Sequence, residues 1–510
     1  MKSNLGVFLS VLISFNLAMA SSPALLVKVI DQKGQAVTGA VVQVGKAPNS
    51  PFAQNTAITN SQGIASFNAS SINGEITDTP ITIVKTGYPK ITYFNQSGIE
   101  FKLQLPPPSL QKQAELSGDF VGWDALIVNF SDIATFGLFL PFLNADKLFA
   151  FQMSDLISTQ VDKFSVLGKD VFVPSNLIFP KQRHSYGIIP ITLNKPIFRL
   201  PMSVPATYSF QAVAGQFPFD DVAGDLVDGK TLFDIINQMT MQKFGLIKDK
   251  TMSGPVSGLH MNVNEAKLGP CLKLETKNAP LPKVAGLALT RAPELVGKPY
   301  QPTDIKNIAA GAQNLSCIKG DSRPVNAMAL AMNYHLENEA MIFHKGMSSI
   351  LARNIPHSST TINLTLKSYF SVPQLKISEA GGVVESTRPE RQGISPTSSA
   401  VHAILSDVTV TQTGTIINES VRPQWIVFGN STLEKIQLPT LSAELLSIDT
   451  RSIYDQIAQT QPPTNFKRWE YIWLGLDPVL QFDNNQLMSV NIGYDLFESM
   501  THAARNAVDF

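Results

Sequence analysis

The feature that most constrains the fold is a set of β-branched residues in residues 25–105. Its valines tend to fall two residues apart, at Val27, Val29, Val37, Val42 and Val44. Half-buried strands show this spacing, because their side chains point alternately to the two faces of a sheet. Turn residues separate the runs, at 31–34 (DQKG) and 59–63 (TNSQG), and Gly can adopt the positive φ that such turns need. The stretch therefore predicts several short strands joined by tight turns.

Three motifs in this stretch follow one another in a fixed order. They are a V-x-D-x-x-G-x-x-V-x-G-A-x-V opening from Val29 to Val42, a T-N-x-x-G turn from Thr59 to Gly63, and Gly87-Tyr88. In these motifs residues 24–105 resemble the carboxypeptidase regulatory-like module, a transthyretin-like β-sandwich. Ala36 departs from the family, which usually has proline there. The resemblance implies an accessory spacer, packing or binding unit without catalytic residues, whose loops are candidates for binding carbohydrate or protein.

The first twenty residues have the pattern of a secretory signal peptide. Lys2 precedes an apolar run at 5–17, and Ala18-Met19-Ala20 is a small-x-small cleavage site. The run is too short for a membrane-spanning helix, which needs about 20 apolar residues. We therefore predict a secreted or periplasmic protein with no transmembrane segment after cleavage.

Length and charge narrow the functional class. A chain of 510 residues is too long to fold around a single hydrophobic core, so three or four domains are expected. Lys plus Arg and Asp plus Glu are both 40, which gives a formal net charge of zero. A neutral chain lacks the basic surface that nucleic-acid binding requires, so no nucleic-acid partner is expected.

The two cysteines, Cys271 and Cys317, are the only ones in the chain. In an exported protein a pair of cysteines indicates a disulfide, and two buried free thiols are the alternative.

Pro106-Pro107-Pro108 favours an extended spacer and marks the clearest domain boundary. The expected organisation is a signal peptide (1–20), the β-sandwich (21–105), a Pro-rich linker (106–115), a β-rich domain with a helix at 232–244 (116–250), a mixed domain in which 325–343 forms a helix or a hairpin (251–357), and a C-terminal β-sandwich-like domain that has a strand at 487–492 and ends in an amphipathic helix (358–510). The fold class is thus mainly β and multidomain, with a few short helices.

A metal site has one weak candidate. His335, Glu337 and Glu339 would share a face of a strand, and two of them a face of a helix, but solvated surfaces show the same pattern. The H-x-x-E and H-E-x-x-H patterns of zinc peptidases and the G-x-S-x-G pattern of serine hydrolases are absent. We therefore expect no cofactor and assign no catalytic residue.

An acidic cluster lies at 220–228, with Asp220, Asp221, Asp225 and Asp228. Its spacing does not match a calcium loop, and a solvated helix surface explains it better. Glycoside hydrolysis needs only two carboxyl groups that meet in space, which sequence spacing does not test.

Three alternating aromatic residues, Trp469, Tyr471 and Trp473, would share one face of a strand. Such a row can stack on sugar rings or can form the wall of a β-sandwich core. Taken together, the sequence predicts an exported, non-enzymatic binding, adhesion or scaffolding protein of the cell envelope or extracellular space, with a glycan or an envelope protein as its partner. The alternative is a hydrolase of envelope or extracellular polysaccharide.

Overall fold

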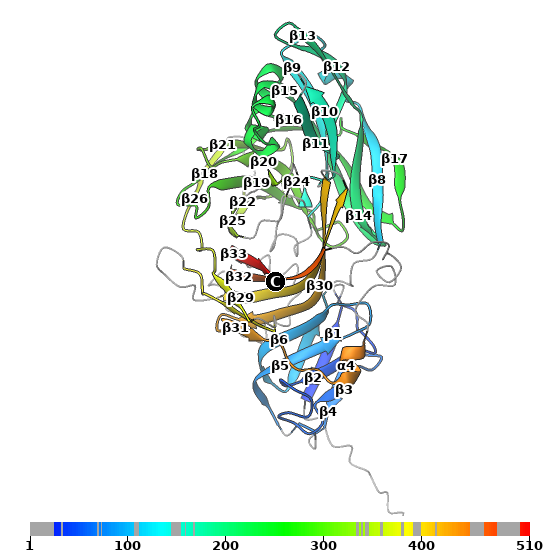
Figure 1. The fold of residues 1–510 in the computed structure, drawn as a ribbon, viewed down its shortest axis with the longest axis vertical. Helices are drawn as coiled ribbons and strands as arrows, with labels where there is room; N and C mark the ends of the chain where they lie inside the picture. Colours follow the sequence, from blue (N-terminus) through cyan, green and yellow to red (C-terminus); the bar gives the residue numbers. More distant parts are fainter. Residues whose placement is uncertain are drawn as a thin grey trace, which may run out of the picture.

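The fold is described from a computed structural model of the chain. It describes residues 25–31, 34–68, 71–72, 74–106, 112–143, 155–158, 160–166, 169–332, 336–337, 340–341, 346–356, 361–378, 382–390, 399–413, 416–448, 464–476 and 500–510. The predicted signal peptide and the strand expected at 487–492 lie outside these residues. The described chain is mainly β, with short helices, as the sequence predicted (Figure 1).

The N-terminal unit has two sheets around one core. One sheet has the order β4-β1-β7, with bounds Ile64–Phe67, Leu25–Ile30 and Glu100–Gln104. The other consists of β6 (Lys90–Gly98), β5 (Ile76–Val84), β2 (Val41–Val44) and β3 (Thr56–Ile58). The five valines of the alternating pattern are all buried in the core between the sheets.

The second of these sheets continues far beyond the N-terminal unit. Its twelve strands have the order β20-β19-β22-β25-β33-β32-β29-β30-β6-β5-β2-β3. The added bounds are Tyr300–Asn307 (β20), Lys283–Arg291 (β19), Val325–Met332 (β22), Met347–Ile355 (β25), Met500–Asp509 (β33), Thr464–Leu476 (β32), Ser399–Thr413 (β29) and Ile416–Asn430 (β30). β6 pairs with β30 in parallel, from Lys90 beside Trp425 to Tyr93 beside Phe428. The sheet therefore crosses the boundaries predicted at 105 and 358.

An eight-stranded sheet covers one end of the molecule (Figure 1). Its path is β13 (Ile189–Lys195), β12 (Leu177–Tyr186), β9 (Ile133–Pro141), β15 (Ala206–Pro218), β16 (Thr240–Met252), β18 (Ala266–Thr276) and β21 (Gln313–Ile318), with β26 (Ile362–Leu366) on β18. The sheet β14-β8-β17 (Ile197–Val204, Lys112–Val121, Val256–Asn262) packs on it through a second core.

The smaller elements complete the fold. They are the strands β10 (Val161–Val166), β11 (Lys169–Pro174), β23 (Leu336–Glu337), β24 (Ala340–Met341), β27 (Leu375–Ile377), β28 (Val383–Ser386) and β31 (Lys435–Gln437), the helices α2 (Phe219–Val227), α3 (Leu232–Ile235) and α4 (Ala443–Ser447), and the 3-10 turns η1 (Asp124–Leu126) and η3 (Ile236–Gln238). β8 begins at Lys112, inside the spacer predicted at 106–115.

The segment predicted as a helix or a hairpin at 325–343 and the predicted C-terminal helix both form strands where the structure describes them. Residues 325–332 form β22, which is buried along its whole length between β19 and β25, so packing overrides the helix propensity of its Ala, Met and Leu residues. The C-terminal segment expected to be an amphipathic helix forms β33 between β25 and β32. Covered on both faces, such a strand need not alternate polar and apolar residues.

The helix predicted at 232–244 is correct only in its first turns. Thr231 and Asp234 form a capping box at the start of α3. After η3 the chain becomes β16, whose pairing with β15 begins at Gln216 opposite Thr240. Ile235, Ile236 and Met239 are buried in the core as the predicted apolar stripe requires.

The disulfide between Cys271 on β18 and Cys317 on β21 is formed, with a Cα–Cα distance of 5.7 Å. The sequence predicted the bond itself, and the structure shows that it joins two neighbouring strands inside a third core.

Candidate functional site

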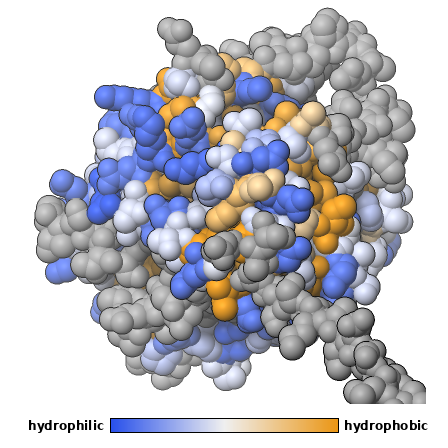
Figure 2. Space-filling view, turned by 90° about the horizontal axis from the view of Figure 1, so that it is seen from below, coloured by the Kyte–Doolittle hydropathy of each residue, from blue (hydrophilic) through white to orange (hydrophobic). Residues whose placement is uncertain are grey.

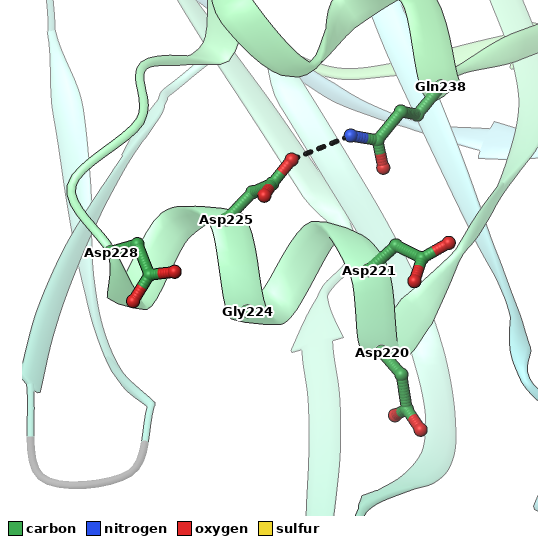
Figure 3. A pocket seen from close by; sticks show the side chains of 6 residues that line it. All are labelled: Asp220, Asp221, Gly224, Asp225, Asp228 and Gln238. Carbon is green, nitrogen blue, oxygen red and sulfur yellow. Dashed lines mark hydrogen bonds between the residues drawn. The ribbon is translucent and has the colours of Figure 1, made fainter.

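A hollow of about 440 Å³ lies against α2 (Figure 3). It is lined by Asp220, Asp221, Gly224, Asp225, Asp228 and Gln238. The helix that carries it is amphipathic: Phe219, Val222 and Ala223 are buried, and the aspartates lie on the other side. Asp220 and Asp221 occupy the first turn, where negative charge interacts favourably with the helix dipole. The acidic cluster is therefore the exposed side of a helix, in agreement with the sequence interpretation.

Asp225 is the only one of the four aspartates with an ion pair among the described contacts. It accepts hydrogen bonds from Lys230 Nζ at 2.7 Å and from Gln238 Nε2 at 2.7 Å. The hydrogen bond from Lys230, followed by that from Gln238, lowers the pKa of Asp225 below its ordinary value. A general acid for glycoside hydrolysis needs a raised pKa, so Asp225 is not suited to that role.

The carboxylates of the hollow do not form a metal site. In Figure 3, Asp220, Asp221 and Asp228 point in different directions. Within the described part of the chain, no group of three or more His, Cys, Asp or Glu side chains could hold a metal ion. The hollow is best described as an open, acidic surface.

The three alternating aromatic residues lie in the protein core. Trp469, Tyr471 and Trp473 are each 0 % exposed and contact one another and neighbouring apolar residues in one cluster. The Tyr471 hydroxyl donates to the carbonyl of Leu433, and Trp473 Nε1 donates to Ser386 Oγ at 3.0 Å. A sugar ring cannot reach these faces, so their interpretation as a possible ligand-binding row is corrected in favour of the core alternative.

The opposite face of β32 carries buried charges that the sequence analysis missed. Arg468 and Glu470 on β32 are 2 % and 5 % exposed, and Arg505 on β33 is 0 % exposed. Arg505 Nη1 lies 3.6 Å from Glu470 Oε2, and burial lowers the pKa of Arg505 while the charge of Glu470 opposes this shift. The sequence does contain a pattern that could have indicated these buried charges, because charged residues occupy alternate positions within otherwise apolar segments.

A second buried pair lies where the two large sheets meet. Asp304 on β20 accepts a hydrogen bond from the backbone N–H of Ser316 on β21 at 2.7 Å, and Lys306 Nζ donates to the carbonyls of Ile236 and Met239. Burial raises the pKa of Asp304 and lowers that of Lys306. Every one of these bonds joins β20 to the eight-stranded sheet or its helices, which indicates a structural role.

The weak metal candidate is only partly described. His335 and Glu339 lie outside the described residues, and of Glu337 the structure gives only its place in β23. The site stays a prediction.

Two segments next to β12, the loop before β9 and the turn between β12 and β13, carry exposed apolar side chains. We call Val128, Phe130, Ile133, Ile188 and Ile189 the apolar tip; they are 47 %, 71 %, 40 %, 98 % and 48 % exposed. These are five of the twelve large apolar side chains found exposed in the described chain. Figure 2 shows the end that carries the N-terminal unit, where hydrophobic patches lie among hydrophilic residues.

None of the described helices combines the length and apolar character needed to cross a membrane.

Comparisons with known proteins give no relative from sequence: no family model and no curated protein matches the chain. Among solved structures, the Bacillus anthracis TIE protein is similar over 68% of this chain and 51% of its own, with 12% identity and a TM-score of 0.16. The present chain thus spans about half of that protein. BcpA, the major pilin subunit of Bacillus cereus, is similar over 67% of this chain and 98% of its own, with 11% identity and a TM-score of 0.13. TM-scores this low do not indicate a shared fold.

Proposed function

We propose that the protein is an exported, non-enzymatic binding, adhesion or scaffolding protein of the cell envelope or the extracellular space. The observation that carries the proposal is the twelve-stranded sheet, which runs from β3 in the N-terminal unit to β20 beside the eight-stranded sheet. A continuous ladder of backbone hydrogen bonds joins parts of the chain that would otherwise move as separate domains. Such a frame holds distant surfaces at fixed positions, which is what a scaffold or an adhesin requires.

Side chains fix the N-terminal unit to this frame. Trp425 Nε1 on β30 donates to Thr92 Oγ1 on β6 at 2.9 Å, and Gln43 Nε2 on β2 donates to the carbonyl of Thr440 at 2.9 Å. The segment after Thr440 continues into α4, where Leu445 packs against Val84. The unit is therefore attached both through the sheet and through a strap from the C-terminal half.

Two features support an exported location. The first is the predicted signal peptide at residues 1–20. The second is the disulfide between Cys271 and Cys317, since disulfides persist in oxidising compartments.

We also propose that residues 24–105 are a carboxypeptidase regulatory-like module that serves as a packing unit. Its two facing sheets with a shared core are in keeping with a β-sandwich. Its attachment to β30 and α4 gives such a unit a packing role.

The test is a binding assay that also measures turnover. Purified chain from residue 21 onward is incubated with peptidoglycan, a glycan array and isolated envelope protein, and both retained protein and released products are measured. Saturable retention without product supports the proposal. Product release that continues over many turnovers would identify a hydrolase of polysaccharide and refute it.

A further inference from the structure

We propose that the apolar tip is a docking surface for a basic protein segment that also carries apolar side chains. The proposal rests on the binding or adhesion role above and specifies its surface and its partner class. Figure 1 places the hairpin of β12 and β13 at the end of the long axis opposite the N-terminal unit. This end is thus the part of the molecule that projects farthest from that unit.

The hairpin presents its apolar residues at a tight turn. Tyr186 pairs with Ile189, so Gly187 and Ile188 form a two-residue connection, and Gly187 adopts a φ of 57°. Ile188 is 98 % exposed at this turn. Tight turns usually carry polar residues, so an isoleucine here is unfavourable for a surface that contacts only water.

The neighbouring loop holds Phe130 in a fixed, exposed position. Phe130 N donates to the carbonyl of Arg183 at 2.6 Å, and Asn129 Oδ1 accepts from Arg183 N at 2.8 Å, so the loop is attached to β12. His184 Nδ1 lies 2.9 Å from the carbonyl of Ser131 and extends this attachment. Phe130 has a φ of 59°, which is uncommon for a residue with a side chain, and it is 71 % exposed. A preorganised aromatic side chain loses little conformational freedom when it binds a partner.

The charges around the tip distinguish between its potential occupants. In the segments that form the tip and the first turn of α2 (124–133, 181–189 and 219–221), the exposed acidic residues are Asp124, Asp132, Asp220 and Asp221, and the exposed basic residues are Lys181 and Arg183. None of the six has an ion pair within the described structure. The excess of acidic residues repels an anionic membrane, and a second copy docked tip to tip would bring like charges together. A basic partner complements these charges.

The acidic side of α2 continues this surface. Pro218 pairs with Ile133 and Phe219 N donates to the carbonyl of Asp132 at 2.7 Å, so α2 starts beside the tip. A partner whose apolar side chains contact Phe130 and Ile188 can place Lys or Arg near Asp220 and Asp221.

The experiment measures peptide binding by the full exported chain. The probes are three labelled twelve-residue peptides: a basic apolar one (Lys-Leu-Ser-Val repeated), its acidic counterpart with Glu for Lys, and a basic polar counterpart with Ser for Leu and Val. Fluorescence anisotropy at low salt gives each affinity. The tip variant is Phe130→Ser with Ile188→Ser, and the matched control is Ile58→Ser with Leu446→Ser, which changes two side chains that are 61 % and 59 % exposed in the N-terminal unit and α4.

We expect the basic apolar peptide to bind most tightly. The tip variant should weaken this binding at least about tenfold, as loss of central apolar anchors does, and the control should leave it unchanged. Asp220→Asn with Asp221→Asn should weaken it roughly threefold and reduce its salt dependence. Because Ile188 is almost fully exposed, Ile188→Ser alone is a variant that should fold normally.

Three results would overturn the proposal. One is equal binding of the acidic and basic peptides. Another is binding to phosphatidylglycerol vesicles, but not to the peptides, that is lost in the tip variant. The last is a wild-type dimer in light scattering that the tip variant converts to monomer. Turnover of polysaccharide in the earlier assay, with peptide binding intact, would refute the proposed non-enzymatic function and leave the docking surface standing.

Discussion

Arg468 on β32 and Asp509 on β33 form a two-bond ion pair across neighbouring strands. Arg468 Nε lies 2.5 Å from Asp509 Oδ1, and Nη2 lies 3.2 Å from Oδ2. Two residues further along β32, the pair Glu470–Arg505 has the opposite orientation. Both ion pairs therefore form only when β33 lies in the observed register relative to β32. A shift of one residue would turn the charged side chains of β33 to the other face of the sheet.

Removing one partner of the first pair should destabilise the protein. Asp509→Asn removes the charge that pairs with the buried Arg468 guanidinium at 2.5 Å, and we expect a loss of about 3 kcal/mol in the free energy of unfolding, measured with urea. The double variant Arg468→Met with Asp509→Leu replaces the pair with apolar side chains and should recover most of that loss. An unchanged stability in Asp509→Asn would show that the pair does not fix the strand.

His402 should make stability depend on pH. Its ring stacks on Phe428 with centroids 4.4 Å apart, and burial lowers its pKa from 6.5 to about 4. Above pH 6.5 the histidine is neutral in both states and its full contribution is present. As the pH falls from 6.5 to 4, the unfolded chain binds a proton that the folded chain does not, so stability is lost, by at most about 3 kcal/mol. Comparison of urea unfolding at pH 7.5 and 4.5 measures the loss.

The control for this prediction is His402→Phe, which keeps a ring against Phe428 and removes the titrating group. Carboxylates also titrate in this range. The contribution of His402 is therefore the pH-dependent difference in unfolding free energy between the wild type and His402→Phe. Parallel stability curves for wild type and variant across pH 7.5 to 4.5 would contradict the assignment to His402.

The disulfide should contribute substantially to stability. Its cysteines are separated by 46 residues, and closing a loop of that size is worth about 4 kcal/mol in the chain-entropy model. The Cys271→Ala, Cys317→Ala double variant should therefore unfold at lower urea concentration. In the denatured wild type, Ellman's reagent should detect no thiol before reduction and two after it; two thiols before reduction would show that the bond is absent.

The aromatic row should respond to mutation as a core does. Trp473→Ala removes a fully buried indole and should cost roughly 3–5 kcal/mol in unfolding free energy. Tyr471→Phe keeps the ring and loses the hydroxyl bond to Leu433, so it should cost only about 1 kcal/mol. Unchanged stability of Trp473→Ala together with lost glycan retention would restore the sugar-binding interpretation.

The sequence predicted individual strands better than their assembly. Val27 and Val29 lie on the core face of β1 and Val42 and Val44 on that of β2, with Lys28 and Gln43 between them on the other face, so the period of two could be recognised from the sequence. Ala503, Ala504 and Ala507 in β33 are buried on both faces, and without alternation the same residues fit a helix. Pairing of β6 with β30 joins residues over 330 positions apart, as the Trp425–Thr92 bond shows, and no local pattern encodes such a contact.

The same limit applied to the candidate sites. The acidic cluster at 220–228 was recognised because its aspartates lie close together in the sequence, in α2 and at its C-cap. The apolar tip was missed because Phe130 and Ile188 come from different elements, and only the folded chain shows that both are exposed and that the Phe130 loop is bonded to the β12 strand that leads to Ile188.

Whether the N-terminal unit is an integral part of the frame can be tested on α4. Leu445 is 1 % exposed and packs on Val84 of β5, whereas its neighbour Leu446 is 59 % exposed. Leu445→Ala should lower the unfolding free energy by about 2–3 kcal/mol, because it removes a buried side chain at the strap, and Leu446→Ala should leave it unchanged. If the strap and the β6–β30 pairing hold the unit in place, amide exchange in β2 and β5 should accelerate in Leu445→Ala and the wild type should unfold in a single transition. A separate early transition of the N-terminal unit in the wild type would instead show that it folds independently, since its stability would then not depend on β30 or α4.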